Sequence, residues 1–187
     1  MPGITLAKLS QLELLLERQA ILDCLLRFTR GIDRFDRDLF LSAFHSDATI
    51  AAGVFVGGPS DLYDWAASMH EHGQSATHHN VLNHSCDISG DTAHTETYYL
   101  FVGRNRDDTN WLAGGRYIDR FERRAGDWKI ALRTTAIEWA TSVPSLPLPF
   151  ADLPDLYLNG TPTRDKHDLS YRRPLTNERP LNIPKSR

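Results

Sequence analysis

Residues 92–124, TAHTETYYLFVGRNRDDTNWLAGGRYIDRFERR, carry the clearest indication of the fold, because apolar and polar side chains alternate along them with a period of two. Such alternation is typical of strands with one buried face. Turn-forming sequences, SGD at 89–91 and AGD at 125–127, flank this stretch, and RDDTN interrupts it. The pattern continues on both sides and predicts strands at 78–88, 92–105, 111–124 and 127–139. Strands joined by such short turns pair antiparallel.

The residues ahead of these strands have helical spacing. A first helix is predicted over 12–32, with Gly31 as its stop signal. Leu15, Ala20, Ile21, Cys24, Leu25 and Phe28 have helical spacing within it. Asp36 is suited to cap a second helix, whose apolar residues are Leu39, Phe40, Ala43 and Phe44. A short hairpin over 47–58 precedes a third helix over 61–72, opened by Pro59.

Helices followed by a meander of strands indicate the α+β class. We therefore expect a strongly curved, mostly antiparallel sheet closed by three N-terminal helices. A pocket is expected between the sheet and the helices.

The chain changes in composition near residue 144. Eight of its ten prolines lie in 144–187, and this density prevents long helices and central strands. We predict one domain over 1–143 and an extended, proline-rich tail over 144–187. Apolar residues in the first half of the tail lead us to expect that this half packs on the domain: Leu146, Leu148, Phe150, Leu153, Leu156 and Tyr157.

Composition excludes several classes of protein. The 187 residues are 41% hydrophobic and 24% charged, which excludes wholesale disorder. A net charge of -3 gives no overall attraction to nucleic acid or to anionic membranes. No apolar run approaches the roughly 20 residues that span a bilayer, and we expect no signal peptide. The two cysteines, Cys24 and Cys86, cannot form a disulfide framework, so we expect a reduced, cytoplasmic protein.

Five of the eight histidines lie in residues 70–84: His70, His72, His78, His79 and His84. One hypothesis is an open zinc or iron site. No acidic residue lies within 72–86, so we expect no metal and attribute most of the cluster to chance. A second hypothesis pairs one histidine with Asp33, because a buried carboxylate fixes the tautomer of an imidazole and stabilises the imidazolium. The alternative for Asp33 is an ordinary turn or cap residue.

Several motifs, in order along residues 15–140, resemble the SnoaL-like branch of the nuclear-transport-factor-2-like superfamily. They are RGIDRFD (30–36), FHSDA (44–48), THHNVLN (77–83), GDTAHTETY (90–98) and GRYIDRFERRAGDWKI (115–130). The resemblance implies a cone-shaped fold. Members include scytalone dehydratase, bile acid 7α-dehydratase, hexachlorocyclohexane dehydrochlorinase, polyketide cyclases, ketosteroid isomerase and the noncatalytic β-subunits of ring-hydroxylating dioxygenases.

The dehydratase and dehydrochlorinase members imply roles for three residues. Their helix-ending aspartate falls on Asp33, and their catalytic histidine, four residues before an asparagine, falls on His79 ahead of Asn83. Their pocket arginine falls on Arg133. The chain departs from these members at Phe28, where a lysine or tyrosine is common.

Alternation along the strands places further residues at the pocket. The inward sets are Thr95, Thr97, Tyr99 and Phe101; Trp111, Ala113, Gly115 and Tyr117; and Arg133, Thr135, Ile137 and Trp139. Either tyrosine, Tyr99 or Tyr117, could donate a phenolic hydrogen bond or simply pack. Arg133 either pairs with Glu138 or another acid, or holds an anion or carbonyl. The expected substrate-binding residues are Phe28, Trp65, His78, Asn83, Tyr99, Phe101, Tyr117 and Trp139.

We predict a cofactor-independent lyase for a hydrophobic aromatic or polycyclic molecule. His79 is the general base, Asp33 its partner and Arg133 the electrophilic stabiliser. The reaction is a dehydratase-type β-elimination or a retro-aldol-type cleavage. The alternatives are an isomerase or cyclase, or a noncatalytic scaffold like the dioxygenase β-subunits.

The predicted outward face of the sheet is too apolar for free exposure to water, with Leu100, Val102, Leu112, Ile118 and Ile130. We therefore expect a homo-oligomer. The resemblance favours a trimer over a dimer.

Overall fold

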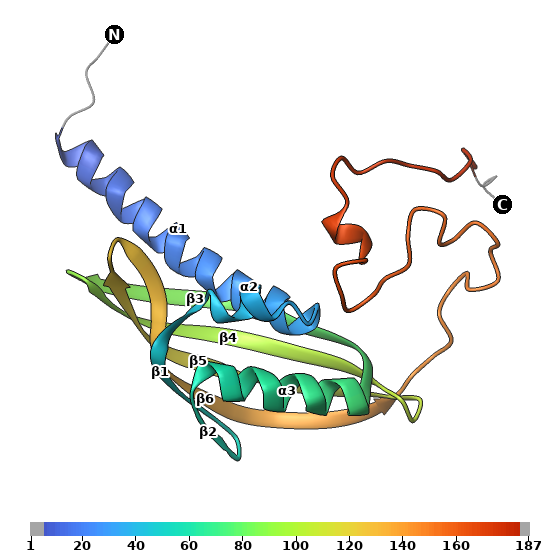
Figure 1. The fold of residues 1–187 in the computed structure, drawn as a ribbon, viewed down its shortest axis with the longest axis horizontal. Coiled ribbons are helices and arrows are strands. Elements are labelled where there is room, and N and C mark those ends of the chain that lie inside the picture. Colours follow the sequence, from blue (N-terminus) through green and yellow to red (C-terminus); the bar gives the residue numbers. More distant parts are fainter. Residues whose placement is uncertain (1–5, 184–187) are drawn as a thin grey trace, which may run out of the picture.

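A curved sheet forms the body of the protein, as a computed structural model that describes residues 6–183 shows (Figure 1). The six strands of this range are β1 (Phe44–Ala52), β2 (Phe55–Gly57), β3 (Gln74–Ser89), β4 (Thr92–Asn105), β5 (Thr109–Arg124) and β6 (Asp127–Pro144). Their order is β2-β1-β6-β5-β4-β3. All neighbours pair antiparallel except β1 and β6, which are parallel. The predicted α+β class with a mostly antiparallel sheet is confirmed.

Three helices lie over one face of this sheet in the described part of the chain: α1 (Leu6–Asp33), α2 (Arg37–Leu41) and α3 (Pro59–Gly73) (Figure 1). The core between the two layers is rich in aromatic rings, including Phe28, Phe40, Phe44 and Phe121. Asp36 caps α2 as predicted, since its side chain accepts a hydrogen bond from the backbone N–H of Leu39.

We predicted a first helix over 12–32 with Gly31 as its stop signal, but the helix continues past Gly31 to Asp33. Gly31 is needed for close helix packing and not for ending the helix. A Cβ at this position would lie 2.5 Å from the backbone nitrogen of Phe40, so only glycine lets α1 approach α2 this closely.

Two β-bulges on β6 change which side chains face the helices. The partners of Arg120 and Phe121 are Leu132 and Ile130, which leaves Ala131 as an extra residue. The partners of Gly115 and Gly114 are Ile137 and Trp139, which leaves Glu138 extra. A bulge interrupts the strict alternation of strand faces. Ile130 is therefore fully buried instead of facing outward as expected, and Trp139 packs over Gly114 on the outer face.

The tail after β6 has no strand among its described residues, and its one helical turn is a 3-10 helix, Leu169–Tyr171. The expectation that its first half packs on the domain is wrong for the single chain, since Leu146, Leu148 and Phe150 are more than half exposed. A short segment of its second half, 164–171, packs on the domain instead. The start of the predicted domain, 1–5, and the end of the tail, 184–187, lie outside the described residues.

Residues 164–171 of the tail dock through polar groups at the ends of the helices. Lys166 and the hydroxyl of Tyr171 both bond to the Asp36 carboxylate, at 2.5 and 2.9 Å. Arg164 donates to the carbonyls of His70 and Gln74, both at 3.0 Å, at the C-terminal end of α3. Carbonyls at a helix C-terminus lack intrahelical partners and carry partial negative charge, so a guanidinium stabilises them.

Within residues 6–183, no helix is both long enough and apolar enough to cross a membrane.

Candidate active site

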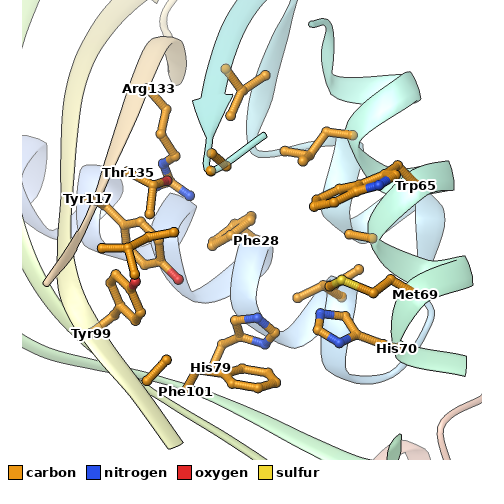
Figure 2. Close-up of a pocket in the computed structure, with 18 of the residues that line it drawn as sticks. Phe28, Trp65, Met69, His70, His79, Tyr99, Phe101, Tyr117, Arg133 and Thr135 are labelled. Atoms are coloured by element: carbon orange, nitrogen blue, oxygen red, sulfur yellow. The ribbon is translucent and has the colours of Figure 1, made fainter. Parts of the chain in front are cut away.

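A cavity of about 240 Å³ lies between the concave face of the sheet and the helices (Figure 2). Most of its wall is apolar. Exposed residues mark its mouth at Val54, Trp65 and Ile137. At the opposite end, His70, His79 and Phe101 form its floor (Figure 2).

His79 is held at two points by Asp33. Its Nδ1 lies 2.7 Å from Asp33 Oδ1, and its backbone N–H donates to Asp33 Oδ2 at 2.8 Å. Asp33 is the last residue of α1 and His79 lies on β3, so the pair joins helix to sheet. Burial by itself raises the pKa of Asp33, but the hydrogen bonds and charge of His79 hold that pKa below its usual value. The ionised Asp33 accepts the Nδ1 proton, and the Nε2 of His79 is left with its lone pair.

Aromatic rings surround the His79 imidazole. Phe101 lies 4.8 Å from it between ring centroids, and Phe28 lies 6.4 Å away. His70 is the third neighbour, at 5.5 Å. These contacts fix the plane of the imidazole and keep water from most of its surface.

Arg133 is 1% exposed and lies on the far side of Phe28 from His79 (Figure 2). Its Nε and Nη2 bond to the two carboxylate oxygens of Asp119, at 2.7 and 2.8 Å. Its guanidinium also lies 4.2 Å from the ring centroids of both Phe28 and Tyr117. The sequence left the partner open between Glu138 and another acid, and the partner is Asp119. Among the described residues, Arg133 Nη1 has no hydrogen-bond partner.

Tyr99 and Tyr117 lie stacked beside Arg133, with ring centroids 4.6 Å apart. Both line the cavity. Burial raises the pKa of each phenol above its usual value, so both hydroxyls keep their protons at neutral pH.

The predicted site residues fall into two groups. Seven of those that we singled out as catalytic or substrate-binding line the cavity: Phe28, Trp65, His79, Tyr99, Phe101, Tyr117 and Arg133. Asp33 lies behind His79. Three others do not line it: His78, Asn83 and Trp139.

The reasons differ among these three residues. His78 precedes His79 on the same strand and points to the opposite, exposed face. Asn83 lies where β3 has an extra residue between the partners of Tyr99 and Thr97, and is exposed. Trp139 is turned outward by the bulge at Glu138.

Two important residues were missed by the sequence analysis. His70 was not singled out from the histidine cluster, yet it follows Leu62 and Ala66 at intervals of four, which is the spacing of a buried helix face. Asp119 was not paired with Arg133. It belongs to the inward-facing set of β5 with Tyr117, and its direct partner across the sheet is Arg133.

In the part of the chain that the structure describes, no three metal-ligating side chains gather in one place. The histidines of 70–84 do not all converge on one point. His70 and His79 face the cavity, His78 is exposed, and His84 bonds to Thr97 at 2.8 Å.

Comparisons with known proteins agree with this architecture. Residues 13–134 match the model of the SnoaL-like domain. A crystal structure of LinA has a TM-score of 0.69 at 23% identity, covering 75% of this chain and 99% of that chain. The hexachlorocyclohexane dehydrochlorinase LinA-type3 from Novosphingobium barchaimii LL02 gives 0.67 at 21%, covering 74% and 99%.

A protein of unknown function with a cystatin-like fold from Nostoc punctiforme gives a TM-score of 0.58 at 25% identity, covering 71% and 95%. A comparison of the sequence with curated proteins finds no match.

Proposed function

Since the chain belongs to the SnoaL-like family, we propose that it is a cofactor-independent lyase acting on a hydrophobic aromatic or polycyclic small molecule. The observation that carries this proposal is the His79–Asp33 pair at the floor of an apolar cavity. A carboxylate-bound imidazole with a free lone pair is a general base.

The proposed reaction begins when His79 Nε2 removes a proton from a carbon beside a carbonyl or an aromatic ring. Asp33 stabilises the imidazolium that forms. The electron pair of the broken C–H bond then forms a double bond as a β leaving group departs. When the leaving group is hydroxide, the imidazolium returns the proton and water is released. A retro-aldol-type cleavage uses the same base on a hydroxyl proton.

Arg133 supplies the electrophile in this proposal. Its Nη1 hydrogens are free among the described residues, while Asp119 fixes the rest of the guanidinium. A preorganised donor in a site that excludes water stabilises negative charge that develops on a substrate oxygen. The pair with Asp119 holds this donor in place before the substrate arrives.

The same site geometry bears on the two alternative functions, an isomerase or cyclase and a noncatalytic scaffold. An isomerase or cyclase uses the same proton abstraction, and the fate of the carbanion depends on the substrate. A noncatalytic scaffold needs no space beside an activated histidine. The cavity of about 240 Å³ is therefore an argument for the enzyme.

A screen of fused-ring β-hydroxy ketones tests the proposal, with the unsaturated product followed by absorbance. We expect turnover without added cofactor and a 10²–10⁴-fold loss of kcat/KM in His79→Ala, which removes the base. His78→Ala is the matched control, since its side chain faces the other side of β3, and it should lose less than about threefold. Equal effects of the two substitutions would sink the proposed mechanism.

A further inference from the structure

The second imidazole on the floor of the cavity, His70, has no part in the mechanism above. Its side chain lies beside His79 (Figure 2) and stacks on Phe101 with a centroid distance of 5.3 Å. The residue is 4% exposed. A polar group so well buried needs hydrogen-bond partners, and these partners determine what it presents to a ligand.

A chain of hydrogen bonds runs from His70 to the protein surface. His70 Nδ1 lies 3.1 Å from Gln74 Oε1, and Gln74 Nε2 lies 3.0 Å from Asn105 Oδ1. Asn105 Nδ2 lies 2.8 Å from Thr109 Oγ1, and Thr109 Oγ1 lies 2.6 Å from Asp107 Oδ1. The five residues come from α3, β3, β4, the turn after β4 and β5.

The exposed end of this chain fixes the direction of every bond in it. Hydrogen bonds from Thr109 lower the pKa of Asp107, so its carboxylate is ionised and can only accept. The single hydroxyl proton of Thr109 therefore goes to Asp107, and Thr109 Oγ1 must accept from the amide of Asn105. The Asn105 oxygen then faces Gln74, and the Gln74 oxygen faces His70.

His70 must consequently donate from Nδ1, which leaves a lone pair on Nε2. Burial, reinforced by the charge of His79, lowers the pKa of His70 to about 4, so the ring is neutral at physiological pH. A neutral imidazole protonated on Nδ1 is only an acceptor at Nε2. No hydrogen-bond partner for this Nε2 occurs among residues 6–183, and the residue lines the cavity.

We propose that His70 is a specificity-determining residue that accepts a hydrogen bond from a hydroxyl group of the ligand. The inference rests on the proposed function, because it assumes that the cavity holds the substrate. It narrows the substrate class to fused-ring compounds that carry a hydroxyl near the carbon from which His79 takes its proton. A ligand that presents only hydrogen-bond acceptors or halogens at this point leaves the His70 lone pair unpaired.

A matched pair of ligands tests the inference without turnover. 2-Naphthol and naphthalene have the same ring system and differ in one donor group. Binding is followed by quenching of tryptophan fluorescence, because Trp65 and Trp111 line the cavity. We expect 2-naphthol to bind at least about tenfold more tightly than naphthalene, which corresponds to about 1.4 kcal/mol, the scale of one buried hydrogen bond.

The substitution His70→Phe keeps a ring stacked on Phe101 and removes the acceptor. We expect it to abolish the preference for 2-naphthol and to leave naphthalene affinity within about twofold. Persistence of the preference in this variant would assign it to another group, such as His79, and would overturn the inference. Equal binding of both ligands to the unsubstituted protein would also overturn it, while the base mechanism of His79 would stand.

The tautomer of His70 provides a measurement that requires no substitution. In protein labelled with ¹⁵N-histidine, long-range ¹H–¹⁵N spectra distinguish the two ring nitrogens. We expect a neutral His70 with its proton on Nδ1 at pH 7. A proton on Nε2 would overturn the inference, and this result decides the question if His70→Phe does not fold. Failure of both ligands to bind would overturn the use of the cavity itself, and the inference with it.

Discussion

The ion pair between Arg133 and Asp119 is both a support of the fold and a part of the proposed site, and substitutions can separate these two roles. The side chains of both residues are 1% exposed or less. Removal of one partner from a buried pair leaves an uncompensated charge, which typically costs about 3–5 kcal/mol, whereas replacing both by apolar residues is often neutral. We expect Arg133→Met to lower the free energy of unfolding by that amount.

The double variant Arg133→Met with Asp119→Leu is the control, and it should recover most of this loss. Urea unfolding measures both. Activity should be absent from both variants if Arg133 acts on the substrate. A double variant with restored stability and normal activity would show that Arg133 is only structural.

The low pKa of His70 predicts how stability depends on pH. The folded-state pKa is about 4, below the ordinary value of 6.5, so unfolding takes up a proton between these two values. The free energy of unfolding should therefore fall as the pH is lowered from about 6.5 to about 4, by up to about 3 kcal/mol. The Asp33 pair does not contribute in the upper part of this window, because its stabilisation is lost only as the pH falls below about 4.

Chemical unfolding at several pH values checks this expectation. His70→Phe has no proton to bind at this position, so its stability should change much less over the same range. An identical slope in the two proteins would show that folding does not lower the pKa of His70.

At the scale of elements, the close approach of α1 to α2 depends on Gly31. An alanine Cβ would lie 2.5 to 2.7 Å from the backbone nitrogen, Cα and Cβ of Phe40, and backbone atoms cannot move aside cheaply. We expect Gly31→Ala to destabilise the protein by roughly 2 kcal/mol or more, the usual effect of overpacking. It should also lower activity, because Asp33 follows two residues later.

Gly73→Ala is the matched control. Gly73 is the last residue of α3, and a Cβ there would meet no atom within 4 Å. This substitution should be neutral within about 0.5 kcal/mol. Thermal unfolding distinguishes the two variants, and equal effects would show that the approach of Phe40 is not the constraint.

Much of the arrangement of elements was predictable because periodicity and turn residues are local signals. The strand 92–105 was predicted with its observed ends, and Asp36 and Pro59 mark helix starts in the sequence. The bulges at Ala131 and Glu138 were not predictable, because no particular residue type marks an extra residue in a strand. That is why Trp139 was placed in the cavity and Ile130 outside it.

The site was predictable in part for the same reason. Motif resemblance selected Asp33, His79 and Arg133, which lie in or behind the cavity. Resemblance could not supply the chain of bonds behind His70, since its members are far apart in sequence and are connected only by folding.

At the scale of the whole molecule, the outer face of the sheet remains to be covered. Tyr98, Ile118, Leu132 and Trp139 are each about two-fifths exposed or more in the single chain. Leu146, Leu148 and Phe150 in the tail are also exposed. We predict a homo-oligomer, a trimer in preference to a dimer, that buries this face.

Light scattering measures the assembly. The double variant Ile118→Lys with Leu132→Lys introduces like charges on the outer face, and we expect it to be monomeric. Leu26→Lys is the matched control and should assemble normally, because Leu26 is exposed on α1, in the helix layer on the opposite side of the sheet. A monomeric unsubstituted protein would refute the prediction. A truncation after Ser145 tests whether the tail contributes to the assembly of the oligomer.

The bulges on β6 also determine where the chain can change in length. Deletion of one residue within a strand normally turns every later side chain to the opposite face. At Ala131 and Glu138 the residues on either side already have their partners on β5, so deletion of the extra residue leaves those pairings in place. Natural homologues that differ by a single-residue gap in this strand should therefore have the gap at one of these two positions, while a gap at Thr134 between them would move Arg133 or Thr135 out of register with the cavity.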